Sequence, residues 1–277
     1  MRIALGVEYD GSDFFGWQIQ KDGRSVQGCM ESALSAVANH PVRVVCAGRT
    51  DTGVHALGQV VHFDTESSRP ERAWTLGVNS ELPQDVSVRW AQVVPDDFHA
   101  RFSARTRSYS YLIFNSPVRS ALLKSRMWWV RSRLDVEAMN DAAAVLVGKH
   151  DFSSFRAAGC QANTATRRVD RLAVHRLDDE IVQMEITANA FLHHMVRNII
   201  GTLAVVGRGE KCSGWLSEVL MARDRCLSGV TAPPAGLYLV RVNYDSLLIQ
   251  PRSPSLTMLA PGLSDQAETP DNPDDLE

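Results

Sequence analysis

The order of the apolar segments constrains the fold of this chain more than any other feature of its sequence. In the first half, runs rich in β-branched residues predict strands, and apolar positions spaced three or four apart predict helices. These elements are a strand at 2–9, a helix at 25–38, strands at 42–46 and 58–63, a helix at 70–79 and a strand at 86–94. Their order, βαββαβ, is that of a ferredoxin-like unit.

The second half predicts the same order with two insertions. The common elements are a strand at 107–114, a helix at 135–147 that Gly148 ends, strands at 168–176 and 181–187, a helix at 190–205 and a strand at 237–242. The insertions are a strand at 127–130 and a short helix at 215–222. We therefore expect an α+β fold in which two halves, 1–104 and 105–250, share one mixed and mainly antiparallel sheet.

Composition limits the compartments and sites that this chain can have. No apolar run approaches the roughly 18–20 residues that a membrane-spanning helix needs, and the first residues lack the apolar core of a secretory signal. The five cysteines form an odd set without a Cys-x-x-Cys pair, which favours reduced thiols in the cytosol over disulfides or a zinc site. The adjacent His193 and His194 resemble a metal-binding pair, but no Glu or Cys lies at ligand spacing. We therefore predict a cytoplasmic protein with no metal site, whose paired histidines belong to the core or the surface.

The negative net charge of −3 is concentrated at one end of the chain. Residues 251–277 hold one arginine against six acidic side chains, a net −5, which leaves +2 for residues 1–250. The same end is rich in Pro and Ser and poor in aromatic residues, a composition typical of disorder. We predict a disordered acidic tail and a mildly basic folded body, whose charge is compatible with RNA binding.

A turn between two predicted strands combines residues suited to catalysis. Its ten residues, 47–56, read Ala-Gly-Arg-Thr-Asp-Thr-Gly-Val-His-Ala. Gly48 and Gly53 permit a tight turn and the close approach of a ligand, and Arg49 suits an anionic or planar partner. Asp51 would be exposed at the tip and held by rigid strands on either side, a common setting for a catalytic group. The same residue types also occur in ordinary surface turns.

Asp51-Thr52-Gly53 is also the signature of an aspartic protease. That chemistry requires two carboxylates that share one proton, and no second Asp-Thr-Gly or Asp-Ser-Gly occurs in the 277 residues. Arg49 would also disfavour the half-protonated state that such a pair needs. The sequence therefore argues against a protease.

Residues 48–56 resemble the active-site motif of pseudouridine synthases, in the form that the tRNA pseudouridine synthase A family carries. The resemblance implies that Asp51 is the essential nucleophile and that Arg49 helps to hold the target nucleotide outside its helix. A carboxylate suits this role because it can form and release a covalent intermediate. Three routes remain open: attack on C6 of the base, attack on C1′ of the ribose, and formation of a glycal after proton loss at C2′.

A second segment, 98–111, interleaves arginines with aromatic residues. This mixture suits RNA, because cations contact phosphates and rings stack on bases. Tyr109 and Tyr111 also fit the core face of a strand. The resemblance extends to this Tyr-x-Tyr segment and implies that Tyr109 stacks on the uracil and takes or relays a proton. The candidate RNA-binding cations of the segment are Arg101, Arg105 and Arg107.

Residues 189–201 form a mostly apolar predicted helix with one cation, Arg197. His193, Arg197 and Gly201 would share one face at a spacing of four residues, with Gly201 leaving room beside the arginine. An arginine in such a helix either reaches solvent or pairs with a buried carboxylate. The segment resembles the third motif of the same family, which implies that Arg197 pairs with Asp51.

Residues 232–240 resemble the closing motif of the family, which implies that Leu237 forms an apolar wall of the pocket. Taken together, the four motifs extend the resemblance over residues 3–242. It implies the pseudouridine synthase fold with a central basic cleft, a homodimer whose cleft draws on both subunits, and no cofactor. It also implies isomerisation of uridine at positions 38, 39 and 40 in the anticodon stem-loop of tRNA. The alternative of a catalytically silent RNA-binding module would show a replaced aspartate, and Asp51 is present.

Overall fold

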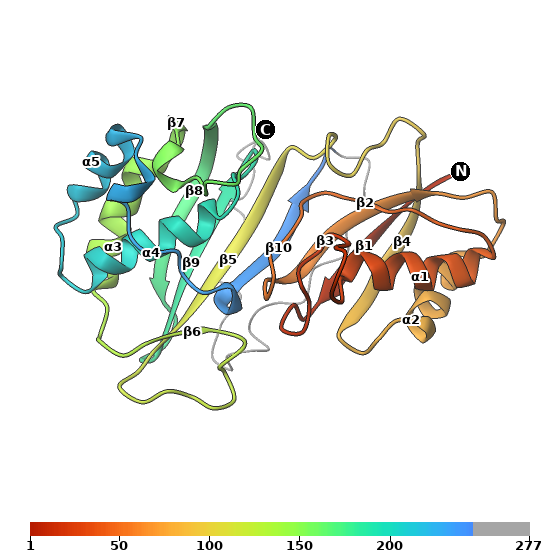
Figure 1. Ribbon diagram of the computed structural model, residues 1–277, viewed down its shortest axis with the longest axis horizontal. Helices are drawn as coiled ribbons and strands as arrows, with labels where there is room; N and C mark the ends of the chain where they lie inside the picture. Colours follow the sequence, from red (N-terminus) through yellow and green to blue (C-terminus); the bar gives the residue numbers. More distant parts are fainter. Residues whose placement is uncertain (246–277) are drawn as a thin grey trace, which may run out of the picture.

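The computed structural model describes residues 1–245, and the predicted acidic tail at 251–277 lies outside them. The strands are β1 (Arg2–Tyr9), β2 (Val45–Cys46), β3 (His55–Asp64), β4 (Val86–Val94), β5 (Thr106–Asn115), β6 (Trp128–Val130), β7 (Gly148–Asp151), β8 (Thr166–Arg176), β9 (Ile181–Ala188) and β10 (Leu237–Asn243). The helices are α1 (Val26–Ala38), α2 (Val78–Glu81), α3 (Val136–Ala143), α4 (Met195–Gly207) and α5 (Trp215–Ala222). The described strands form one mixed sheet in the order β4-β1-β3-β10-β5-β9-β8-β7, with β2 beside β3 and β6 beside β5 (Figure 1).

Each half of the chain arranges its strands in the same order. The sheet runs β4-β1-β3-β2 in the first half and β10-β5-β9-β8 in the second. Both read fourth, first, third and second strand of a βαββαβ unit, which confirms the predicted α+β fold with two similar halves. The halves meet where β10 runs parallel to β3, with Tyr238 opposite His55 and Leu239 opposite Ala56.

The second strand is shorter than its sequence predicts. The apolar run at 42–46 forms strand only at Val45–Cys46, where it pairs with His62 and Val61 of β3. Further along the same edge of β3, the pairing partner is β10. A strand from the far end of the described chain thus takes part of this edge, which no local pattern reveals.

The first two helices show where local sequence determines structure and where it does not. The side chain of Ser25 accepts a hydrogen bond from the backbone N–H of Gly28 at 3.2 Å and so caps the N-terminus of α1, close to the start predicted at residue 25. The helix predicted at 70–79 is instead a π-helical turn (Ala73–Gly77) that continues into α2. The apolar spacing does not distinguish this wider turn from an α-helix.

The helix predicted at 135–147 is also divided. It is regular as α3 to Ala143 and then tightens to a 3-10 turn that ends at Leu146. Gly148, with a φ of 108°, turns the chain out of the helix as expected. It then begins β7, a strand that the sequence pattern did not predict.

The fourth helix begins later than its sequence predicts, at Met195 rather than at residue 190. The backbone carbonyl of His193 accepts a hydrogen bond from the N–H of Ala157 in a neighbouring loop, at 3.1 Å. The carbonyl of His193 is therefore bonded to another part of the chain and not to the first turn of α4. The prediction that His193 shares a helical face with Arg197 is wrong.

The two faces of β5 belong to different apolar clusters, as the alternation of strand side chains requires. Tyr109, Tyr111 and Ile113 join the main core with residues of the helices. Leu112 points to the other face and packs in a smaller cluster with Met127, Ile181 and Tyr238. Within the described residues, no helix is both long and apolar enough to cross a membrane.

Candidate active site

The loop between β2 and β3 is held from several sides. The Gln59 side-chain amide donates to the carbonyl of Gly48 at 2.6 Å, and the N–H of Trp17 donates to the carbonyl of Thr50 at 3.0 Å. Within the loop, the N–H of Val54 donates to the carbonyl of Asp51 at 3.1 Å. These bonds fix the backbone while the carboxyl group of Asp51 stays 27% exposed. The predicted setting of an accessible acid on a rigid turn is therefore present.

Gly53 allows this loop to meet the second half of the chain. Its φ is 76°, in the left-handed region that residues with a Cβ rarely adopt. A Cβ at this position would also lie 3.0 Å from Cγ of Pro234, in the turn just before β10. The glycine therefore provides both the turn and the close approach between the halves.

Arg197 connects the two halves through its side chain. Its Nη1 lies 3.3 Å from Oδ2 of Asp51, and its Nε donates to the carbonyl of Ala232 at 2.8 Å. The N–H of Ala232 donates in turn to the carbonyl of Arg197 at 3.1 Å. The arginine is only 13% exposed, so it does not reach out to solvent. The structure thus brings Arg197 to Asp51 as the resemblance implies.

The close packing of α4 that places Arg197 depends on Gly201. A Cβ added to Gly201 would lie 1.9 Å from the carbonyl oxygen of Val230, far inside any allowed contact. We expect Gly201→Ala to displace α4 and to destabilise the protein by about 1–3 kcal/mol, as overpacking typically does. Thermal unfolding and single-turnover activity should both fall. Gly159→Ala is the matched control, because a Cβ there would meet no atom within 4 Å, and equal melting temperatures of the two variants would contradict the prediction.

Tyr109 lies in the site with its ring buried. The ring packs edge-on against Phe191, with centroids 5.0 Å apart and an angle of 83°. A Cβ on Gly48 would lie 3.8 Å from the phenol oxygen, which places that oxygen beside the start of the loop that carries Asp51. Burial raises the pKa of Tyr109 above its ordinary value of 10, and the charge of Asp51 adds to the shift. The phenol therefore keeps its proton at neutral pH and suits a relay better than a free base.

The closing segment contributes an apolar surface. Leu237 is buried at the start of β10, opposite Tyr111 of β5. The Tyr111 hydroxyl donates to the carbonyl of Pro233 at 2.6 Å, so this second tyrosine holds the segment in place. The position of Leu237 is compatible with the predicted apolar wall.

Of the predicted cations, three are exposed. Arg49 is exposed on the loop between β2 and β3. Arg101 is placed over the ring of Phe102, 5.5 Å from its centroid. Arg105 forms an exposed salt bridge with Asp245 at 2.5 Å, which offsets its charge.

Arg107 is buried and does not fit the predicted contact with RNA. Its guanidinium donates to backbone carbonyls of Ala47, Arg101, Ala104 and Asn189 at 2.6–3.2 Å. Ala47 begins the loop that carries Asp51, so Arg107 connects this loop to β5. The sequence pattern placed Arg107 among the RNA-binding cations because a pattern of arginines does not reveal burial.

The sequence missed two residues of the site, His193 and His194. The Nε2 of His193 lies 3.4 Å from Oδ1 of Asp51, and the Nε2 of His194 lies 3.3 Å from Oδ2. Burial lowers the pKa of His194 below its ordinary 6.5, although the charge of Asp51 opposes the shift. The pair was set aside because no carboxylate lies at ligand spacing along the chain. The carboxylate that the two histidines meet is that of Asp51, which lies in the other half of the chain. Within the described residues, Asp51, His193 and His194 are the group whose ligand atoms lie close enough together to hold a metal ion.

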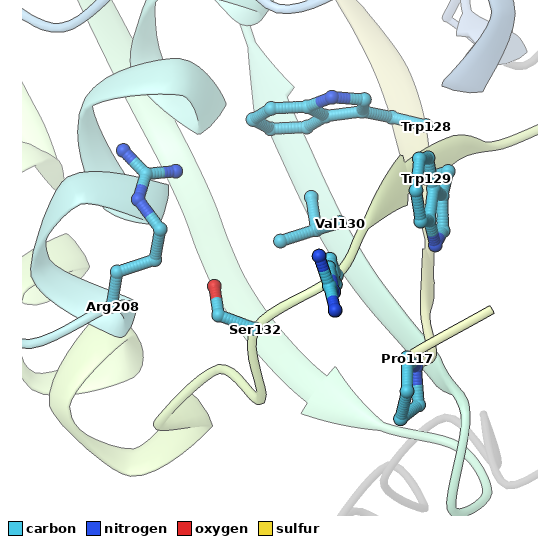
Figure 2. A pocket seen from close by; sticks show the side chains of 7 residues that line it. Pro117, Trp128, Trp129, Val130, Ser132 and Arg208 are labelled. Atoms are coloured by element: carbon cyan, nitrogen blue, oxygen red, sulfur yellow. The ribbon is translucent and has the colours of Figure 1, made fainter. Parts of the chain in front are cut away.

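A separate pocket lies at the far end of α4. It has a volume of about 590 Å³ and opens between β6 and Arg208 (Figure 2). None of the predicted site residues lines it, so it is distinct from the Asp51 site. Its lining residues are Pro117, Trp128, Trp129, Val130, Arg131, Ser132 and Arg208.

Comparison with known proteins identifies the family of this chain. The profile of a family described as tRNA pseudouridine synthase matches residues 6–103 and 142–245. The chain is similar to proteins named tRNA pseudouridine synthase A from Pseudoalteromonas atlantica (57% identity, 91% of this chain and 95% of the relative), Tolumonas auensis (55%, 88% and 93%) and Coxiella burnetii (52%, 91% and 97%). A solved archaeal box H/ACA Nop10–Cbf5 complex resembles it at 11% identity and a TM-score of 0.32, over 73% of this chain and 44% of that chain, which is too low to inform function. The chain therefore belongs to the tRNA pseudouridine synthase family and isomerises uridine to pseudouridine in tRNA.

Proposed function

We propose that this enzyme acts on uridine at positions 38, 39 and 40 of the tRNA anticodon stem-loop, with Asp51 as its nucleophile. The observation that carries the proposal is the pairing of Asp51 with Arg197 across the two halves, at 3.3 Å. A partly exposed carboxylate, oriented by a largely buried cation, suits attack on a nucleotide placed above it.

The reaction balances without an external reactant. The bond from C1′ to N1 breaks, the uracil turns, a bond from C1′ to C5 forms, C5 loses its proton and N1 gains one. In this scheme the ring of Tyr109 stacks on the uracil and its phenol relays a proton. Leu237 supplies an apolar wall, and Arg49 holds the nucleotide outside its helix.

The partner in this scheme is the anticodon arm of tRNA, bound by a homodimer in the cytoplasm. Removing a uridine from its stack costs a few kcal/mol, which contacts to the RNA backbone must offset. The exposed Arg49 and Arg101 carry the charge that such contacts require in a central basic cleft. Arg105 can make the same contact once an RNA phosphate replaces Asp245 in its salt bridge.

Conversion of defined tRNA transcripts tests the proposal. Transcripts that carry tritium at C5 of uridine should release it on incubation with the enzyme, and mass labelling should map pseudouridine to positions 38, 39 and 40. Transcripts with cytidine at these three positions serve as the control and should show no release. Conversion confined to other positions would contradict the assignment of the substrate.

Binding of tRNA should weaken steeply as salt increases, because phosphate contacts release counterions. We expect the affinity to fall by at least about tenfold between 50 and 200 mM salt. Filter binding at several salt concentrations measures this dependence.

Deleting residues 251–277 removes a net charge of −5 and should leave catalysis intact while tightening tRNA binding modestly. Single-turnover conversion and filter binding measure these two quantities. A truncation that inactivates the enzyme would contradict the prediction.

Replacing Tyr109 separates its two predicted roles. Tyr109→Phe keeps the ring against Phe191 and should preserve tRNA binding, but it removes the phenol. If the phenol relays a proton, the single-turnover rate should fall by about 10²–10⁴-fold. Tyr109→Ala should lose the stacking contribution as well, roughly 1–3 kcal/mol of binding. A Phe variant with the wild-type rate would leave Tyr109 as a stacking surface only.

A further inference from the structure

Each oxygen of the Asp51 carboxylate lies close to an imidazole nitrogen. His193 approaches Oδ1 and His194 approaches Oδ2, at 3.4 and 3.3 Å. One ligand atom from each of the three residues can be chosen so that all lie within 4.8 Å of one another. The reaction scheme above uses Asp51 but neither histidine, so their convergence on one carboxylate calls for a separate explanation.

We propose that Asp51, His193 and His194 form a binding site for a borderline-soft divalent cation of the Zn²⁺ type, and that the bound ion reversibly blocks the enzyme. Imidazole nitrogen and carboxylate oxygen are ligands that Zn²⁺ prefers, at bond lengths of about 2.0–2.2 Å. In a tetrahedral site with such bonds, neighbouring ligand atoms are separated by roughly 3.4 Å. Each histidine nitrogen already lies at about this distance from a carboxylate oxygen of Asp51, His193 from Oδ1 and His194 from Oδ2. One ligand atom from each residue must still draw in from the present limit of 4.8 Å when an ion binds.

The backbone holds both histidines near the ion position. The carbonyl of His193 accepts from Ala157, and the carbonyl of His194 accepts from Asn198 at 2.9 Å. The side chains of His193 and His194 remain 44% and 28% exposed. An ion can therefore enter from solvent, and the two imidazole rings already lie side by side, with centroids 4.0 Å apart.

Arg197 sets the expected strength of this site. Its Nη1 lies 3.3 Å from Oδ2 of Asp51, so a cation and the guanidinium compete for the same carboxylate. We therefore expect weaker binding than at a structural zinc site, and reversal by a chelator. Mg²⁺ prefers oxygen ligands and keeps several waters, so it should not bind to two imidazoles and one carboxylate.

Occupation of the site has a chemical consequence for the nucleophile. An oxygen lone pair that coordinates the ion is not available to attack the nucleotide, and the ion fills the space above the carboxylate. Binding of the ion is independent of the reaction, whereas the inhibition rests on the proposed role of Asp51.

Metal titration of the full chain without RNA tests the binding step. Co²⁺ should produce visible absorption typical of a tetrahedral site with a stoichiometry of one, and Zn²⁺ should displace it.

His193→Gln and His194→Gln should each weaken metal binding by at least about tenfold, since even losing a group that only orients a ligand costs 10–100-fold in metal affinity. His175→Gln, at an exposed position of β8, is the matched control and should bind as the parent does. Cys160→Ser tests a neighbouring thiol, whose sulfur accepts from the N–H of His193 at 3.4 Å. Binding that survives both active-site histidine variants, or that disappears with Cys160, would overturn the proposal.

Single-turnover conversion of tRNA tests the blocking step. Each variant is compared with its own rate without metal, so that basal activity does not enter. Zn²⁺ should slow the parent and the His175 variant, EDTA should restore the rate, and the same concentration of Mg²⁺ should have no effect. The two active-site histidine variants should need at least about tenfold more Zn²⁺ for the same inhibition. A parent enzyme that binds one Zn²⁺ and keeps its full rate would refute the blocking role. An enzyme inactive on tRNA without metal would refute the proposed function instead, and the Co²⁺ titration would still decide the metal site.

Discussion

Asp51→Asn should reduce conversion of uridine to the background rate while tRNA affinity stays within a few-fold. The amide keeps the shape of the side chain but lacks the charge and nucleophilicity of the carboxylate. Loss of the nucleophile of a catalytic triad has lowered kcat by on the order of 10⁶-fold in another enzyme. We therefore expect a larger loss of rate here than a poorly positioned substrate alone would cause. The loop is fixed by backbone bonds at Gly48 and Thr50, so the variant should remain folded.

Single-turnover conversion and filter binding measure the two quantities separately. Asp141→Asn, at an exposed position of α3, makes the same chemical change elsewhere and should keep full activity. Turnover of the Asp51 variant near the parent rate would remove this residue from the mechanism.

Arg197→Ala should have the second largest effect, a loss of at least about 100-fold in single-turnover rate together with a lower melting temperature. Breaking a buried ion pair by removing one partner typically costs about 3–5 kcal/mol, and the cost should be smaller here because Asp51 is 27% exposed. The substitution also leaves the carbonyl of Ala232 without its donor. The closing segment that carries Leu237 should then loosen.

Two further variants separate charge from geometry. Arg197→Lys keeps the charge but cannot contact Asp51 and Ala232 with the same fork, so its activity should lie between those of the Ala variant and the parent. Arg208→Ala removes a cation near the other end of the same helix, where the partner is the exposed Glu210, and should leave the rate unchanged. Full activity of Arg197→Ala would show that the ion pair is not needed.

The element order was predictable because it rests on local periodicity. Runs rich in β-branched residues identified most of the strands, and apolar positions spaced three or four apart identified α1. Boundaries that depend on distant contacts were not predictable. The delayed start of α4 requires the bond from Ala157 to His193, and the short β2 requires β10 on the same edge of β3.

The candidate site divides in the same way. Asp51 and Arg197 could be named because a motif resemblance assigns them, and the structure brings them together. The histidines were dismissed because ligand spacing was sought along the chain, whereas their carboxylate lies in the other half. Arg107 was predicted to contact RNA because a local pattern of charges and rings does not reveal burial. Two of its four carbonyl partners, Ala47 and Asn189, are distant in the sequence.

The central place of β10 also determines when the enzyme can become active during its synthesis. β10 is the last strand of the described chain, yet it lies between β3 and β5 in the middle of the sheet (Figure 1). N-terminal segments leave the ribosome and fold first, so the Asp51 loop is made long before Arg197, which is 146 residues away. Until residues 237–243 emerge, the nascent chain has an open edge on β3, where β10 will pair. Open strand edges favour aggregation, so this interval is when the growing polypeptide most needs protection by a chaperone.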